Sequence, residues 1–374
     1  MGASSKSETR DQGPDHEPGP ALSRVRDPHR PGSGAVALRP FAGGPIISTV
    51  TTPRDPDLAT LIVSPLASRL RDERTRRRIV RTATEALATR GHGKVLVVER
   101  GDPDGIRQAA AAAVRDGSSA VVLAGGDGTI RDAAGALGGT GVAVGIVPCG
   151  TGNLYAAAIG VPRNLDAAVA ALATGRPRRL DAGEVRLNPP PGVPGTATAP
   201  PPPPEPVPFI VACGTGLDAQ MIAATSREMK RRYGVAAYFL AASRLLGNLT
   251  PRPTVLTIDG VRTELESVVV LVANCGEAIP GVLRPRLPIE PDDGLLHVFV
   301  LPRGGIVDGI RGALELMTSA AAGFSPSGAA VRLSGTQVRV EVTPAGPTEV
   351  DGDPFPAASL DARILPGALS IILR

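Results

Sequence analysis

Short aliphatic segments alternate with helix-like segments between residues 58 and 147, and few architectures accommodate such an alternation. Apolar runs of this length, bounded by turn residues, predict buried strands, and the stretches between them predict helices. Strands are predicted at 58–63, 94–98, 120–123 and 142–147, and helices at 69–91, 104–117 (capped by Asp104) and 130–137. Strands that alternate with helices predict a parallel sheet with right-handed crossovers. We therefore expect an α/β domain here.

The pattern changes after about residue 180, where short strands follow one another with turn residues between them. Strands are predicted at 254–258, 266–274, 295–301, 331–334, 337–343 and 368–373, and helices at 217–230, 233–247 and 306–320. This order is typical of a mainly antiparallel domain. We expect a disordered tail at 1–55, the α/β domain at 56–182 and a β-rich domain at 183–367, interrupted by a stiff proline-rich insertion at 188–208.

The composition of the chain indicates which binding partners and which cellular compartment to expect. A formal net charge of +4 suits an anionic partner such as a nucleotide, a membrane surface or nucleic acid, but aromatic residues, which stack on bases, make up only 2% of the chain. We therefore expect no nucleic-acid partner. The scattered Cys149, Cys213 and Cys275 predict reduced thiols in a cytoplasmic protein, and no apolar run approaches the roughly 18 residues of a membrane-spanning helix.

Two glycine-rich segments follow two successive strands of the predicted parallel sheet. The first, GGDGT at 125–129, leads into a helix, and the second, PCGTGN, occupies 148–153. Glycine lets the backbone approach phosphate oxygens closely, and the start of a helix directs N–H groups toward them. Asp127 is a candidate for binding a metal or a nucleotide hydroxyl, and Thr129 for donating to phosphate; a tight turn with a capping aspartate is the alternative for the first segment alone. Together the segments favour a nucleotide cleft, because the carboxyl ends of parallel strands share one edge of a sheet.

These segments resemble a known family. AGGDGTIRDAAGAL followed by GIVPCGTGNLYAAAIGVP is similar to the catalytic domain of diacylglycerol kinases, a family that includes bacterial lipid kinases and sphingosine kinases. LDAGEV, CGTGLDAQMI, IEPDDGLLHVFVL and EVDGDPF continue the resemblance in the same order, over about 58–374. The resemblance implies a nucleotide-binding domain like that of NAD kinases and diacylglycerol kinases, a C-terminal antiparallel β-sandwich, and a final strand at 368–374 that returns to the first domain.

The resemblance also implies roles for individual residues. The phosphates of ATP would be bound by Ser64, Gly125, Gly126, Asp127, Gly128, Thr129, Ile130, Arg131 and Thr151, and Mg²⁺ by Glu290, Asp293 and Leu295. Asp353 would accept the proton of the attacking hydroxyl, because an alcohol is too weakly acidic to attack unaided. Taken alone, DGDP and Asp293-Gly294 are also ordinary turn sequences.

Three residues depart from the usual family pattern. Ser64 and Arg131 stand where the family usually has Asn, and Asp353 stands where it commonly has Glu, one methylene longer. Ser64 keeps a hydroxyl donor, and Arg131 is able to pair with a phosphate.

The sequence therefore predicts an ATP- and Mg²⁺-dependent lipid kinase, with diacylglycerol as the first candidate acceptor and phosphatidic acid as its product. Two alternatives stay open: an enzyme like NAD kinase with a soluble acceptor, and a catalytically weak protein that binds lipid or nucleotide. Peripheral contact with a membrane is expected through an arginine-rich helix or through the segment at 229–246, in which three basic residues precede an apolar helix. A solvated helix face and core packing are the respective alternatives. The arginines of the first helix are Arg69, Arg71, Arg74, Arg76, Arg77, Arg78 and Arg81. A homodimer is also compatible with the sequence.

Overall fold

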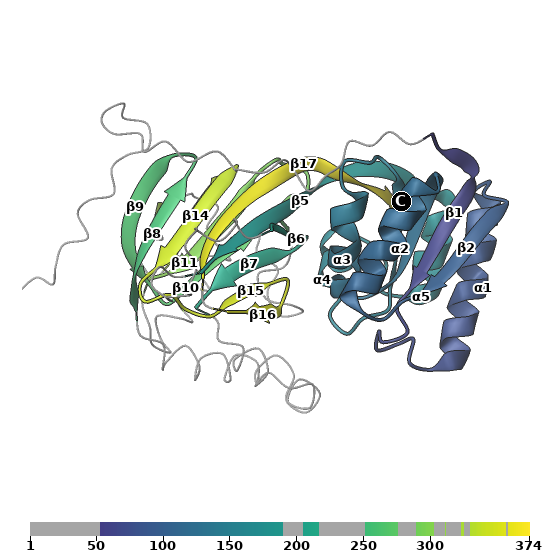
Figure 1. The fold of residues 1–374 in the computed structure, drawn as a ribbon, viewed down its shortest axis with the longest axis horizontal. Helices are drawn as coiled ribbons and strands as arrows, with labels where there is room; N and C mark the ends of the chain where they lie inside the picture. The colour runs from purple at the N-terminus through teal and green to yellow at the C-terminus, as the bar shows by residue number, and fades with distance from the viewer. Residues whose placement is uncertain are drawn as a thin grey trace, which may run out of the picture. The chain divides into compact units, whose positions relative to one another are not determined.

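Two β-sheets organise the chain (Figure 1). The computed structural model describes residues 53–189, 205–216, 251–275, 289–302, 311, 323–324, 330–356 and 358–374. Within these residues, sheet A has ten strands and sheet B has seven. The predicted helices at 217–230 and 233–247, the apolar segment 229–246 and nearly all of the predicted helix at 306–320 lie outside the described residues.

Four parallel strands form the N-terminal part of sheet A, in the order β2-β1-β3-β4. They are β1 (Asp55–Val63), β2 (Lys94–Glu99), β3 (Ser118–Gly125) and β4 (Ala143–Pro148). The helices are α1 (Glu73–Thr89), α2 (Pro103–Arg115), α3 (Asp127–Leu137), α4 (Leu154–Ala158) and α5 (Leu165–Thr174). The predicted α/β fold is confirmed.

Alternating side chains of β1 and β3 enter two separate cores, because successive strand residues point to opposite faces. Ile62 and Val121 lie in the core that includes α2 and α3, whereas Leu61 and Val122 lie in the core that includes α1 and α5. The predicted cap of α2 was wrong by two residues. Asp102, not Asp104, accepts the N–H of Gly105 at 2.6 Å, since a capping residue must precede the first helical turn.

Two long strands carry sheet A from its parallel part into its antiparallel part. They are β5 (Arg176–Asn188) and β17 (Ser359–Leu373), which pair with each other along nearly their whole length. The end of β17 pairs in parallel with β4, through Ser370 and Ala143, and its beginning pairs antiparallel with β14. The remaining strands are β6 (Val207–Phe209), β8 (Arg252–Ile258), β9 (Val261–Ser267) and β14 (Gln337–Val342).

Sheet B is antiparallel and packs face to face on the antiparallel part of sheet A. Its strands are β7 (Ala212–Thr215), β10 (Val269–Ala273), β11 (Leu296–Leu301), β12 (Gly323–Phe324), β13 (Val331–Gly335), β15 (Thr348–Val350) and β16 (Asp353–Phe355). Val298 and Val300 of β11 share a buried core with Val338 and Val340 of β14. The predicted sandwich is therefore confirmed. The single strand predicted at 266–274 is instead the end of β9 and the whole of β10, divided at Val268.

Candidate active site

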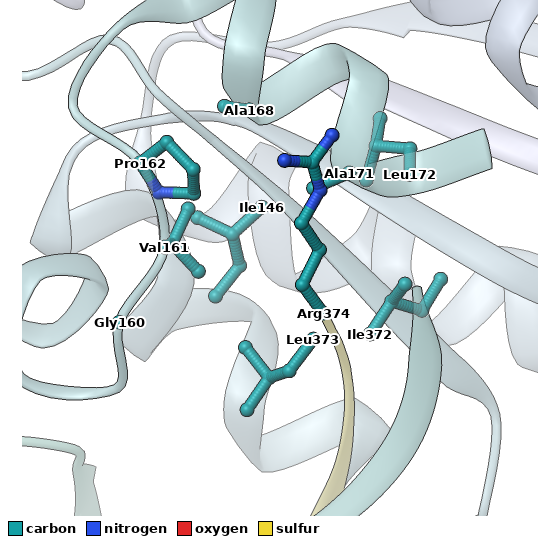
Figure 2. Close-up of a pocket in the computed structure, with 10 residues that line it drawn as sticks. All are labelled: Ile146, Gly160, Val161, Pro162, Ala168, Ala171, Leu172, Ile372, Leu373 and Arg374. Atoms are coloured by element: carbon teal, nitrogen blue, oxygen red, sulfur yellow. The ribbon is translucent and has the colours of Figure 1, made fainter. Parts of the chain in front are cut away.

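A cleft of about 290 Å³ opens at the carboxyl ends of the parallel strands. Its walls are formed by Ser64, Leu66, Ala67, Ser68, Arg71, Gly101, Pro103, Ile106, Gly126, Gly128, Thr129, Arg131, Asp132, Gly150, Thr151 and Asp353. The structure thus brings both glycine segments and Asp353 to one cavity. A second cavity, between α5 and the end of β17, is lined by apolar residues and by Arg374 (Figure 2). It measures only about 40 Å³, which is far too small for a nucleotide.

The first glycine segment presents the start of α3 to the cleft. Gly126 is the N-cap residue of α3, and it has no side chain that could bond to the free N–H groups of the first turn. Such groups are available to an anion, and the helix dipole favours negative charge at this end. Thr129 lies in the same first turn and lines the cleft. This arrangement is suited to binding a phosphate group.

The two glycine segments touch each other through their glycines. A Cβ atom on Gly150 would lie 2.6 Å from the Cα atom of Gly126, closer than two carbon atoms can approach. In addition, the N–H of Cys149 donates to the carbonyl oxygen of Gly125 at 2.7 Å. The close approach explains why glycine is needed at position 150, and it fixes the segments as one surface.

Asp127, in the first glycine segment, forms hydrogen bonds with the backbone that follows the second segment. Its carboxylate oxygens accept the N–H groups of Leu154 and Tyr155, each at 3.0 Å, at the start of α4. Burial raises the pKa of the Asp127 carboxyl, while these N–H donors lower it. Asp127 does not line the cleft, and both of its oxygens are engaged; its structural role is thus to cap the next helix rather than its own.

Arg131 and two carboxylates form a cluster on the cleft wall. The Nε and Nη2 atoms of Arg131 donate to Oδ1 of Asp132 at 3.1 and 2.9 Å, and Nη1 donates to Oδ2 of Asp353 at 2.5 Å. The side chains of Arg131 and Asp132 are each 9% exposed, whereas that of Asp353 is 58% exposed. Asp353 therefore reaches both the cleft and solvent. Sequence reasoning singled out Arg131 and Asp353 separately and missed their contact as well as Asp132.

Two other aspartates of the family-like motifs hold the backbone together. Asp351, the first aspartate of EVDGDPF, accepts the N–H groups of Ile210, Val211 and Ala212 at 2.8–3.0 Å. Burial raises the pKa of Asp351 to about 6, against the opposing effect of these donors. Asp181, in LDAGEV, accepts the N–H groups of Gly294 and Gly367, each at 2.7 Å. Both carboxylates satisfy buried donors from distant segments, which explains their role without any part in chemistry.

The residues predicted to bind Mg²⁺ do not line the cleft. Asp293 accepts the N–H of Leu295 at 2.9 Å through Oδ1, and its Oδ2 lies 2.8 Å from Nε2 of His297. Both oxygens of this carboxylate thus face protein donors, and the described residues contain no cluster of three or more His, Cys, Asp or Glu side chains suited to a metal. The turn at 290–295 as described does not fit a magnesium site beside the phosphates, so the assignment of Glu290, Asp293 and Leu295 stays a prediction.

The arginines of α1 are largely engaged within the protein. Arg77 pairs with Glu73 at 2.5 Å, Arg78 with Asp166 at 2.7 Å and Arg76 with Glu99 at 3.4 Å. These contacts favour the solvated helix face over a lipid-binding surface. Within the described residues, no helix has the length and apolar composition needed to cross a membrane.

The comparisons with known proteins agree with the fold. A diacylglycerol kinase catalytic domain profile matches residues 59–185, and the profile of the YegS C-terminal NAD kinase beta sandwich-like domain matches residues 211–373. A crystal structure described as a diacylglycerol kinase from Bacillus anthracis superimposes with a TM-score of 0.59 at 17% identity, covering 85% of this chain and 97% of that one. At this identity the similarity concerns the fold.

Other proteins share a higher sequence identity with this chain. A "Probable lipid kinase YegS-like" of Pseudomonas aeruginosa is 31% identical over 294 residues, which cover 76% of this chain and 87% of the relative. A "Diacylglycerol kinase" of Mycobacterium tuberculosis is 33% identical over 222 residues, covering 59% of this chain and 67% of that protein. An uncharacterised Synechocystis protein is 26% identical over 267 residues, but this alignment spans only 57% of its length.

The fold is an α/β domain joined to an antiparallel β-sandwich. Its cleft, at the carboxyl ends of the parallel strands, is compatible with phosphate binding. The sequence relatives identify the protein family. The chain belongs to the diacylglycerol kinase-like family of lipid kinases.

Proposed function

We propose that this protein transfers the γ-phosphate of ATP to the hydroxyl group of a lipid, with diacylglycerol as the first candidate acceptor. One observation carries the proposal: Asp353, an exposed carboxylate from the β15–β16 hairpin, shares a cleft with Gly126 and Thr151 of the two glycine segments. The names of the Pseudomonas and Mycobacterium relatives, a lipid kinase and a diacylglycerol kinase, support a lipid acceptor.

The geometry suggests how the residues divide the work. The free N–H groups at the start of α3, with Thr129 and Thr151, would hold the phosphate oxygens and stabilise the charge that develops on them. The acceptor oxygen attacks the γ-phosphorus, the bond to the β,γ-bridging oxygen breaks, and ADP leaves. Asp353 receives the hydroxyl proton and, being exposed, returns it to solvent. Because the predicted magnesium turn does not fit beside the cleft, no step is assigned to a metal.

The test is phosphate transfer from radiolabelled ATP to a panel of acceptors. The panel contains diacylglycerol, ceramide and a sphingoid base in micelles, and NAD in solution. We expect label in a lipid for the wild type and loss of at least about 10²-fold in kcat for Asp353→Asn, because general-base catalysis typically contributes that much. Asp116→Asn, at an exposed position after α2, is the matched control and should retain full activity.

Each other outcome has a distinct meaning. Equal labelling by wild type and Asp353→Asn would remove Asp353 from its role as base. Label in NAD alone would establish the soluble-acceptor alternative. Binding of ATP, measured by calorimetry, without transfer to any acceptor would favour the alternative of a catalytically weak binding protein.

A further inference from the structure

Arg131 holds both ends of the turn that carries Asp353. Its Nη1 atom donates to the Asp353 carboxylate at 2.5 Å and to the carbonyl oxygen of Val350 at 3.3 Å. Val350 ends β15 and Asp353 begins β16, so these two contacts close the turn between them. The intervening Asp351 and Gly352 have φ angles of 49° and 84°, which makes this a tight left-handed turn.

Asp132 fixes Arg131 from the opposite side. The two N–H groups at Nε and Nη2 converge on one oxygen of Asp132, and the guanidinium plane is thereby oriented before it reaches Asp353. Two carboxylates, those of Asp132 and Asp353, surround the single cation of Arg131. Asp132 thus offsets the positive charge of Arg131, and the cluster keeps a net negative charge next to the exposed Asp353.

We infer that Arg131 is the positioning residue for Asp353. It sets where the carboxylate stands relative to the phosphate-binding start of α3, since Arg131 itself belongs to that helix. The inference rests on the proposed function for its catalytic meaning. It also connects two of the departures from the family pattern: the shorter acid at 353 is held by a longer side chain at 131, so that the two positions act as one unit.

A double-mutant cycle tests this coupling. The variants are Arg131→Asn, Asp353→Glu and the double variant, which exchanges both positions for the residues that the family usually has. Misplacement of a reacting group by about 1 Å can cost about 10²-fold in rate, so Arg131→Asn should lower kcat by roughly 10- to 100-fold. The KM for ATP should stay within about threefold, because a positioning defect affects the chemical step more than uniform binding.

The double variant provides the decisive comparison. We expect it to recover at least about tenfold of the kcat lost in Arg131→Asn, because contacting residues are not additive. Arg131→Lys should not rescue, since a single ammonium cannot reach Asp132, Asp353 and Val350 together. Arg339→Asn is the matched control: Arg339 also lies between two carboxylates, Glu341 and Asp361, but away from the cleft, and its loss should leave kcat unchanged.

A second measurement does not require catalysis. Hydrogen–deuterium exchange of the 350–353 backbone should be about tenfold faster in Arg131→Asn than in wild type, and unchanged in Arg339→Asn, because local opening follows the loss of the contacts that close the turn. If wild type phosphorylates no lipid, the proposed function fails, and faster exchange would still establish that Arg131 holds the turn. Unchanged exchange, full kcat in Arg131→Asn, or additive effects in the cycle would overturn the inference.

Discussion

A buried glutamate beside the turn at 350–353 should make the protein less stable as the pH rises. Glu349 lies on β15, is 7% exposed, and accepts the N–H of Gly352 at 2.8 Å. Burial raises its pKa from 4.5 to about 7; the Gly352 donor acts in the opposite direction, and the charges of Asp351 and Asp353 add to the increase. The folded protein therefore keeps a proton here that the unfolded chain has already released.

The direction of the pH dependence follows from proton binding. Between pH 4.5 and about pH 7, the folded state binds more protons at Glu349 than the unfolded state, so the free energy of unfolding decreases as the pH rises. Above about pH 7 both states are ionised and the loss is complete. A difference between pKa values of 4.5 and about 7 corresponds to a loss of about 3 kcal/mol.

Glu349→Gln isolates this effect. Glutamine has the same shape, its carbonyl oxygen can accept the N–H of Gly352, and it carries no charge at any pH. We expect the variant to be more stable than wild type by about 3 kcal/mol at pH 8 and by progressively less toward pH 5. Asp351, whose pKa is also raised, contributes its own slope to both proteins, and subtracting the two curves removes most of it.

The assay is urea denaturation at pH 5, 6, 7 and 8, followed by circular dichroism. Glu266→Gln, an exposed glutamate on β9, is the control and should stay within about 0.5 kcal/mol of wild type throughout. If the stability of Glu349→Gln runs parallel to that of wild type from pH 5 to pH 8, then Glu349 is not held neutral by its surroundings and the reasoning is refuted.

Three further substitutions test the scaffold of the cleft. Gly150→Ala places a Cβ atom against Gly126 and should destabilise the protein by about 1–3 kcal/mol and raise the Kd for an ATP analogue at least about tenfold; an unchanged Kd in a nucleotide titration would show that the two segments need not touch. Asp127→Asn sets an amide group against one of the two N–H donors of α4 and should cost about 1–3 kcal/mol in urea denaturation. Asp351→Ala leaves three N–H groups without their acceptor and should cost about 3–5 kcal/mol, and a loss below 1 kcal/mol in the same assay would contradict its structural role.

Local patterns predicted the α/β part of the fold well. The strands at 58–63, 94–98 and 142–147 were identified within three residues of β1, β2 and β4, because each is a short aliphatic run bounded by turn residues. The glycine segments were placed at one edge by the same reasoning, since successive parallel strands end on the same side of a sheet.

The long strand β5 was missed. Its residues 176–188 begin with three arginines among four positions and contain Glu184, which reads as a loop rather than a strand. In the structure Glu184 is fully buried and pairs with Arg363 of β17, so that partners 179 residues apart in the chain make the charge tolerable. The first half of β17 was missed for a related reason: it is half-buried between β5 and β14, and its alternating pattern lacks a continuous apolar run.

What the sequence by itself determined is the type of fold and the residues at the ends of the parallel strands, because strand periodicity and glycine turns act over a few neighbouring residues. What only the tertiary structure decided is how acidic side chains are used: Asp127 caps α4, Asp351 holds the backbone at the start of β7, and Asp353 faces the cleft while it is paired with Arg131. The contact between Arg131 and Asp353 joins positions 222 residues apart. No local sequence pattern predicts such a contact. The role of a carboxylate depends on which buried N–H donors and cations the fold places next to it.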